Sequence, residues 1–172
     1  MVALLAAVLL GAPAKISHPL LTDAFAKAKK EHKTVFVAFS ASWCGPCRKL
    51  HGTLDKPENR KAFDRAFVDV EVIVLENDGK HKNTDGGMDL LTKLDGADEG
   101  IPFCAAISPD GTILADSRMK GPGTNMGCPM SKEEVAGWDA FLAKVPTLKM
   151  ADRKVLVAAF QPDDITVPAH GR

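Results

Sequence analysis

The sequence predicts a single α/β domain built on a central sheet. Helical and strand patterns alternate along the chain, as they do when helices cover a sheet. The run from Val35 to Phe39 is continuously apolar and rich in β-formers, which is typical of a strand buried on both faces in mid-sheet. A chain of 172 residues can also bury a core without disulfide cross-links.

The composition excludes several classes of protein. The 22 Lys and Arg residues balance the 22 Asp and Glu residues, and 45% of the chain is apolar. These values exclude a disordered or membrane-spanning chain and predict no polyanion-binding surface. With no tyrosine and two tryptophans, the chain also lacks the stacking platforms of nucleic-acid-binding proteins. We therefore expect no nucleic-acid partner and no stable membrane insertion.

Residues 1–14 have the pattern of an export signal. An apolar run from Val2 to Leu10 precedes small residues that end at Ala14, the type of site that a signal peptidase cleaves. The run is shorter than the roughly 20 apolar residues that span a bilayer. No Lys or Arg precedes it, which leaves Met1 open as the true start and a buried first helix as the alternative. The sequence thus predicts a protein that is exported, either to the periplasm or as a secreted protein.

The first half of the chain predicts two helices and two strands in addition to the central motif. Ser17 with His18-Pro19 starts a helix near residues 18–30, whose apolar residues fall on one face. The buried strand 35–39 follows. A helix over residues 57–66 then precedes a second strand over 68–75.

The second half predicts a hairpin and two further long helices. Residues 76–87 form a charged surface loop, and a short helix is expected over 88–94. Strands over 103–107 and 112–116 flank the turn sequence Ser108-Pro109-Asp110-Gly111, which predicts a β-hairpin. After a Gly/Pro-rich loop at 118–130, Ser131 begins a capping box for a helix with core residues Val135, Trp138, Phe141 and Leu142. A last helix is expected over 149–160.

The segment Trp43-Cys44-Gly45-Pro46-Cys47 carries the densest chemistry, where the buried strand gives way to a helix. Two cysteines at this spacing can close a small disulfide. The first lies at a helix start, where unpaired N–H groups and the helix dipole stabilise a thiolate. Such surroundings lower a thiol pKa from about 8.5 to about 7 or below. Pro46 pre-sets the first helical turn. We expect Cys44 to be the reactive sulfur and Cys47 to be the less exposed one.

Other interpretations of the pair stay open at this point. The two cysteines could be half of a zinc site completed by Cys104, Cys128 or a histidine, or an unreactive structural disulfide. A binding or chaperone-like module that uses the surface of Trp43, Pro102 and Cys128 is a third possibility.

The segment from Ala41 to Cys47, placed after the strand, resembles the active-site segment of thioredoxins. Gly100-Ile101-Pro102-Phe103 matches the segment where that family has a cis-proline before an edge strand. Met126-Gly127-Cys128-Pro129 matches its glycine-containing loop on the active-site rim. The resemblance implies a thioredoxin-like fold over residues 15–146, a central mixed β-sheet flanked by helices, with an extra C-terminal helix and tail in 147–172. It also implies a cis Pro102 and a substrate-recognition role for Ile101.

The resemblance implies a thiol–disulfide oxidoreductase. Cys44 attacks a substrate disulfide, Cys47 resolves the mixed disulfide, and no cofactor or metal is needed. Gly45-Pro46 and Ile101 favour a reductase of protein disulfides, supplied by a membrane or soluble thiol donor and acting as a monomer. An oxidase, an isomerase and an assistant in cytochrome or copper-centre maturation are the alternatives. Two departures stand out, because Ala38 replaces the family's buried aspartate and the segment 76–100 is longer than in short thioredoxins.

The remaining candidates receive plainer interpretations. Cys104 is expected to be a buried small hydrophobe, whereas Cys128 is a possible accessory thiol that exchanges with Cys44 or bonds to Cys104. His51 is expected to be a solvated surface histidine. Arg48 and Lys49 lie near enough in sequence to favour the thiolate, although a solvated helix face is the default. Trp43 is expected to shield the disulfide, and the loop 78–85 to be solvated because it lacks calcium-loop spacing.

Overall fold

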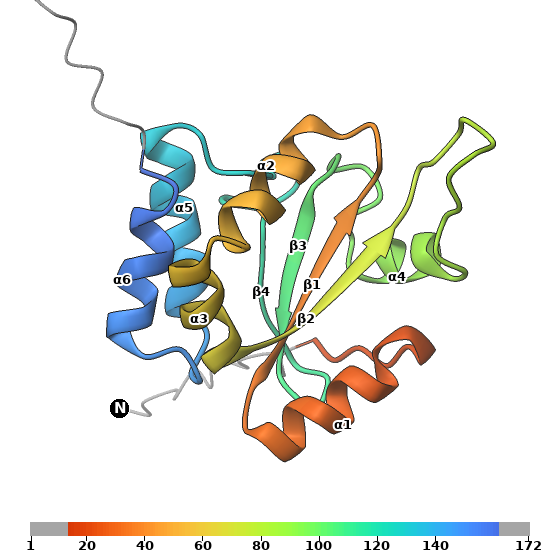
Figure 1. Ribbon diagram of the computed structural model, residues 1–172. Helices are drawn as coiled ribbons and strands as arrows, with labels where there is room; N and C mark the ends of the chain where they lie inside the picture. The colour runs from red at the N-terminus through yellow and green to blue at the C-terminus, as the bar shows by residue number, and fades with distance from the viewer. Residues whose placement is uncertain (1–13, 162–172) are drawn as a thin grey trace, which may run out of the picture.

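Four strands form one mixed sheet at the centre of the protein, and helices cover both faces (Figure 1). The computed structural model describes residues 14–161, so all of the predicted export signal except Ala14 lies outside the described residues. The strand order is β2-β1-β3-β4, with β1 parallel to β2 and the other two pairs antiparallel. The central mixed sheet that the sequence predicts is therefore confirmed. The strands are β1 (Thr34–Ser40), β2 (Phe67–Ile73), β3 (Phe103–Ile107) and β4 (Ile113–Asp116).

Strand β1 is buried along its whole length, as its apolar run predicts. Its side chains alternate between the two faces of the sheet. Phe36 and Ala38 pack in one core cluster, whereas Val35, Val37 and Phe39 pack in the other. The two clusters make the sheet the middle of three layers.

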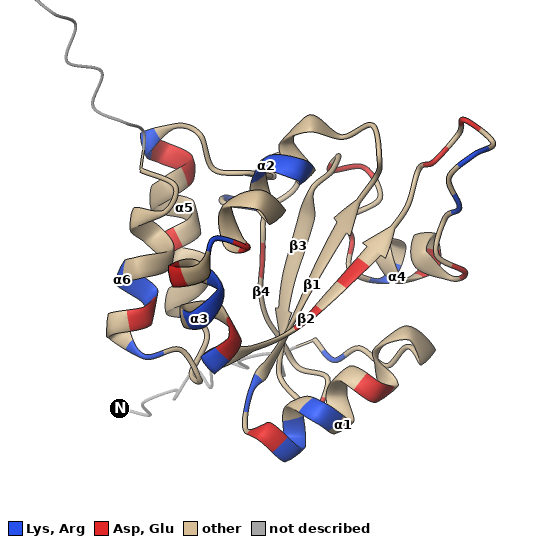
Figure 2. Ribbon diagram, in the orientation of Figure 1, with Lys and Arg blue, Asp and Glu red and all other residues tan. Residues whose placement is uncertain are grey.

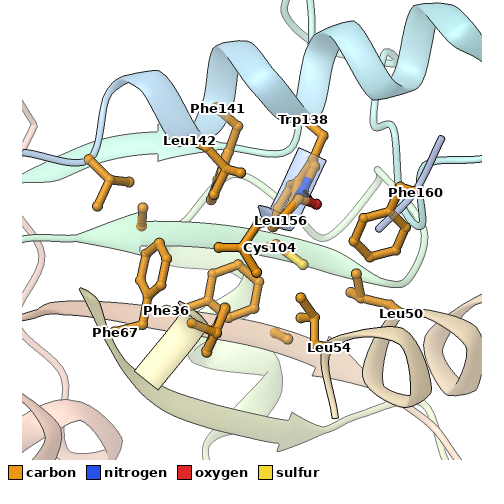
Figure 3. Close-up of a cluster of buried hydrophobic side chains, with 14 of the residues drawn as sticks. Phe36, Leu50, Leu54, Phe67, Cys104, Trp138, Phe141, Leu142, Leu156 and Phe160 are labelled. Atoms are coloured by element: carbon orange, nitrogen blue, oxygen red, sulfur yellow. Dashed lines mark hydrogen bonds between the residues drawn. The ribbon is translucent and has the colours of Figure 1, made fainter. Parts of the chain in front are cut away.

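Four helices cover the face to which Phe36 points: α2 (Gly45–Leu54), α3 (Pro57–Ala66), α5 (Lys132–Ala143) and α6 (Met150–Ala158). Their core residues surround Cys104 in Figure 3. Trp138 stacks on Phe141 and donates a hydrogen bond from Nε1 to the carbonyl oxygen of Leu156 at 3.1 Å. Leu156 and Phe160 belong to this same core cluster, so α6 shares the core of the domain.

The opposite face is covered by the 3₁₀ turn η1 (Pro19–Leu21), α1 (Thr22–Glu31) and α4 (Gly87–Lys93). The helix predicted over 18–30 thus begins with a 3₁₀ turn. Its cap is the side chain of His18, whose Nδ1 accepts a hydrogen bond from the N–H of Leu20. The capping box predicted at Ser131 for α5 is present, with both reciprocal hydrogen bonds.

Strand β3 corrects one expectation drawn from the resemblance. It is an interior strand between β1 and β4, not an edge strand, and all five of its residues are buried. Pro102 precedes the first residue of the strand, so its missing N–H falls outside the hydrogen-bonded ladder. A proline there is compatible with an interior strand.

The hairpin between β3 and β4 is confirmed, with a turn that requires glycine. Gly111 has a φ of +85°, and a Cβ at that position would lie 2.3 Å from the carbonyl oxygen of Ile16. The N–H of Ile16 donates to the carbonyl oxygen of Gly111 at 2.8 Å. The start of the described chain is thereby joined to the hairpin.

Charged residues of both signs are interspersed on the helices, without a one-sign field (Figure 2). This distribution agrees with the balanced composition. Among residues 14–161, no helix is both long and apolar enough to cross a membrane.

Candidate redox site

Cys44 and Cys47 are joined by a disulfide at the start of α2, with their Cα atoms 5.3 Å apart. β1 ends at Ser40, and α2 begins at Gly45 with Cys44 as its N-cap. The Sγ of Cys44 accepts a hydrogen bond from the N–H of Cys47 at 3.1 Å. Pro46 lies in the first turn, where its lack of an N–H costs nothing. One of the unpaired N–H groups at this helix terminus therefore points at the sulfur of Cys44, which favours a thiolate there.

Both sulfurs are shielded in this disulfide state. Cys44 is 2% exposed and Cys47 is fully buried. The pair packs against Ala41 and the partly buried Ile101. Trp43 by contrast is 54% exposed, and its Nε1 donates to the carbonyl oxygen of Leu75 at 2.9 Å. The indole thus offers an exposed apolar face on the rim, next to the disulfide in sequence.

The Ile101–Pro102 peptide bond is cis, as the resemblance implies. The carbonyl oxygen of Ile101 lies 3.6 Å from the Sγ of Cys44. The backbone that enters β3 is therefore in contact with the sulfur expected to react first.

Asn125 organises this backbone, and sequence reasoning missed it. Its amide Nδ2 lies 3.1 Å from each of three carbonyl oxygens, and its Oδ1 accepts from a hydroxyl and a backbone N–H. The carbonyls belong to Glu99, Gly100 and Pro102, and the donors are Ser117 Oγ at 2.7 Å and Gly127 N at 3.1 Å. A lone asparagine in a Gly/Pro-rich loop carries no sequence signal for this role.

A second set of hydrogen bonds links the motif to the loop after β2. The carboxylate of Glu76 accepts from the N–H of Ser42 at 2.5 Å and from its hydroxyl at 2.8 Å. Arg48 donates to the carbonyl oxygen of Ser42 at 2.6 Å. These bonds and the Trp43–Leu75 bond attach the long loop to the site. No motif in the sequence indicated this contact.

The two other cysteines are free and buried. Cys104 lies inside the core, where burial raises the pKa of its thiol, as expected of a small hydrophobe. Cys128 is 2% exposed and lines a pocket of about 200 Å³ with Pro46 and Pro102. Burial raises the pKa of Cys128, and nearby Lys49 opposes that effect. The structure therefore places Cys128 beside the redox motif as a protonated thiol.

His51 corrects another expectation, because it is not a solvated surface residue. Its side chain is 22% exposed, and its Nε2 lies 3.3 Å from Oε1 of Glu71. The ring lies over β2 because α2 packs on that face of the sheet. It lines a pocket of about 380 Å³ that shares no lining residue with the pocket of Cys128.

Among residues 14–161, one group of three potential metal ligands lies close together, and it contains no cysteine. It consists of Glu76, Asp78 and His81, of which the last two are exposed. Hydrogen bonds from the backbone and side chain of His81 lower the pKa of Asp78 to about 2. The loop residues are thus engaged with each other and with Ser42, and no third ligand lies beside Cys44 and Cys47 among the described residues.

Comparisons with known proteins agree with this geometry. The sequence profile of a family described as thioredoxin-like matches residues 18–109. The chain is 37% identical to a thioredoxin H-type from Oryza sativa subsp. indica over 42% of this chain and 58% of that one. It is 40% identical to a thioredoxin H-type from Chlamydomonas reinhardtii over 27% of this chain and 42% of that one. The chain therefore spans about half the length of these curated relatives.

A solved structure covers more of the chain. The crystal structure of a disulphide isomerase from Xylella fastidiosa Temecula1 superposes with a TM-score of 0.53 and 26% identity. The superposition covers 77% of this chain and 95% of that one.

Proposed function

This chain belongs to the thioredoxin-like family and has its fold, and on that premise we propose that it is an enzyme that reduces disulfides in protein substrates. Cys44 is the nucleophile and Cys47 the resolving thiol. The observation that carries the proposal is the N–H of Cys47 directed at the Sγ of Cys44 from the first turn of α2. That donor and the helix dipole favour the Cys44 thiolate once the disulfide is reduced.

The reaction has two exchange steps. The Cys44 thiolate attacks a sulfur of the substrate disulfide, forms a mixed disulfide and releases the first substrate thiolate. The Cys47 thiolate then attacks the Sγ of Cys44, which reforms the Cys44–Cys47 bond and releases the second substrate thiolate. Two electrons pass from the dithiol to the substrate. A thiol donor must return the protein to its reduced form, and the sulfurs need no metal or cofactor.

Substrate recognition in this scheme uses the exposed surface around the disulfide. Trp43 supplies the apolar face, and the backbone at Ile101 before Pro102 supplies polar groups for an extended substrate segment. Cys128 is the candidate accessory thiol because it lines the pocket beside Pro46 and Pro102. We expect the protein to act as a monomer.

Disulfide isomerisation is the second candidate function. The solved structure of a disulphide isomerase at 26% identity favours it, whereas the curated thioredoxin relatives and the Gly45-Pro46 pair favour reduction. The two differ in redox poise, since thioredoxin has a potential of about −270 mV and protein disulfide isomerase about −180 mV.

The reduction potential of the Cys44–Cys47 pair tests these alternatives. Protein is equilibrated in graded dithiol buffers, its thiols are trapped and counted by mass, and zinc is assayed on the same sample. A potential below about −230 mV supports the reductase, and one above about −180 mV supports an isomerase or oxidase. Stoichiometric zinc in a protein that shows no redox transition would contradict the proposed enzymatic function. Cys47→Ser should in addition accumulate the mixed disulfide on Cys44.

Export is a separate proposal, which rests on the signal pattern of residues 1–14. Cleavage after Ala14 would leave Lys15 as the first residue, and its ammonium pairs with Asp110 at 2.5 Å in the hairpin turn. The sequence of the mature N-terminus, determined on protein recovered from its native host, decides the matter. An intact Met1 on all of the protein would refute export by cleavage.

A further inference from the structure

We propose that His51, supported by Glu71, accepts the proton that Cys47 must lose before it can resolve the mixed disulfide. The inference rests on the proposed exchange reaction. It assigns a proton-transfer role to a pair that neither the sequence motif nor the comparisons single out.

The need for a proton acceptor follows from burial. Cys47 is fully buried, and burial in apolar surroundings disfavours a thiolate. The N–H directed at sulfur at the helix start serves Cys44 and not Cys47. Ala38, on the face of β1 that α2 covers, supplies no titratable group. The second exchange step therefore requires a base from another residue.

His51 lies one turn after Cys47 on α2, at the i+4 spacing that places two side chains on the same side of a helix. Its Nε2 is buried and has no hydrogen-bond partner among the described residues. That is unusual, because nearly all buried polar atoms are paired. The nitrogen can therefore accept a proton, and the i+4 spacing makes His51 and Cys47 neighbours along the helix.

Glu71 is the charged group that faces the ring of His51. On β2 it pairs in register with Ala38, so it lies on the face of the sheet that α2 covers. Its Oε1 lies 3.3 Å from Nε2 of His51, and its side chain is 47% exposed. Its exposure offers a route for the proton to solvent.

The pocket of about 380 Å³ extends from this pair to Ala41. Ala41 also packs against both cysteines. A space of this size accommodates several water molecules, each of about 30 Å³, which can carry a proton from the pair to solvent.

The other charged groups that line the pocket are engaged elsewhere or lie on the loop after β2. Arg48 and Glu76 bind Ser42, and Asp55 lies 3.6 Å from Arg60. His81 pairs with Asp78, and Lys82 lies on the same loop. His51 is therefore the pocket histidine whose ring nitrogen is buried and makes no hydrogen bond, with Glu71 as its charged neighbour.

In the resolving step, the proton passes from the Cys47 thiol to Nε2 of His51. The resulting thiolate attacks the Sγ of Cys44, the bond between Cys44 and the substrate sulfur breaks, and the substrate leaves as a thiolate. The imidazolium then returns its proton through water to the substrate thiolate or to solvent. Atoms and charge balance, and the two electrons stay those of the disulfide exchange.

The test separates the two exchange steps in the full chain. Reduced protein is mixed with increasing concentrations of a peptide disulfide at pH values between 5 and 9. The rate of product release reaches a plateau at saturating disulfide, and this plateau rate reports the resolving step. The fast phase of alkylation of reduced protein by iodoacetamide, followed on the Cys44 peptide by mass, reports the Cys44 thiolate. His81→Gln, at the other histidine of the pocket, is the matched control.

We expect His51→Gln to lower the plateau rate about tenfold to a hundredfold, since general acid–base groups contribute about 10²–10⁴ and water remains as a weaker base. The pH dependence of the wild-type plateau rate should become weaker in this variant. Glu71→Gln should lower the plateau rate by a smaller factor, because it removes the exposed carboxylate that faces the ring. Both variants should keep the alkylation rate of Cys44, and added imidazole should restore part of the plateau rate of His51→Ala.

A plateau rate and profile of His51→Gln within twofold of wild type would overturn the proposal. So would an equal loss of Cys44 alkylation, or the same loss in His81→Gln, since either would indicate general damage. If wild-type protein does not cycle between dithiol and disulfide, the proposed function fails, and the role of His51 fails with it. If wild-type protein cycles and His51→Gln leaves the plateau rate unchanged, only the role of His51 fails.

Discussion

Asn125→Ala is expected to destabilise the protein and slow disulfide exchange, although Asn125 is not one of the reacting residues. The amide of Asn125 has two hydrogens for three carbonyl oxygens at 3.1 Å, so it donates two hydrogen bonds at a time. Its Oδ1 accepts two more, from Ser117 and Gly127. The alanine variant thus loses four hydrogen bonds, and the two that the amide donates hold the backbone before β3.

The expected loss follows from these four bonds. Each contributes about 0.5–1.5 kcal/mol net, and water replaces part of the contribution because Asn125 is half-buried, so we expect about 2–3 kcal/mol in total. The backbone next to Cys44 also becomes less well placed. Because a displacement near 1 Å can cost about a hundredfold in rate, we expect the exchange rate to fall about tenfold.

Urea unfolding of the oxidised protein, followed by tryptophan fluorescence, measures the stability, and reduction of a peptide disulfide measures the rate. Asn77→Ala, in the exposed loop after β2, is the matched control and should change neither quantity. A loss below about 0.5 kcal/mol, which is no more than one net hydrogen bond, together with an unchanged rate would refute the reasoning.

Three further predictions concern the core, the Arg65–Asp152 ion pair and the reactivity of the cysteines. Leu156→Ala should lower the free energy of unfolding in urea by about 2–4 kcal/mol, because it opens a cavity under α6. Val155→Ala, on the exposed side of the same helix, should lower it little. Equal losses in the two variants would contradict the placement of α6 in the core. Asp152→Asn removes a carboxylate whose pKa is lowered chiefly by hydrogen bonds from Arg65. The ionised carboxylate therefore contributes fully to the free energy of unfolding at pH values above the ordinary aspartate pKa of about 3.9. This contribution is lost as the pH falls through the pKa of the folded state. The difference in urea midpoint between wild type and Asp152→Asn should therefore be smaller at pH 3 than at pH 7, and a constant difference would count against the ion pair. In native reduced protein, iodoacetamide should modify Cys44 first, Cys128 slowly and Cys104 last, as peptide mass mapping can follow; early modification of Cys104 would contradict its burial.

The sequence by itself determined the features that depend on short stretches of chain. The apolar run of β1, the turn at Gly111 and the capping box at Ser131 each carry a local signal, and each is present in the structure. The Cys44 to Cys47 spacing likewise predicted a helix-start sulfur pair. Local patterns succeed here because backbone geometry and helix capping act over a few residues.

Tertiary structure alone decided which distant residues meet around that motif. Asn125 reaches the backbone before β3, Glu76 binds Ser42, and Glu71 approaches His51, across separations of 20 to 34 residues. The expectation that β3 is an edge strand was also wrong, because sheet order depends on pairing between strands far apart in the chain. Polar contacts of this kind arise from packing one element on another, and no periodicity or spacing along the chain records them.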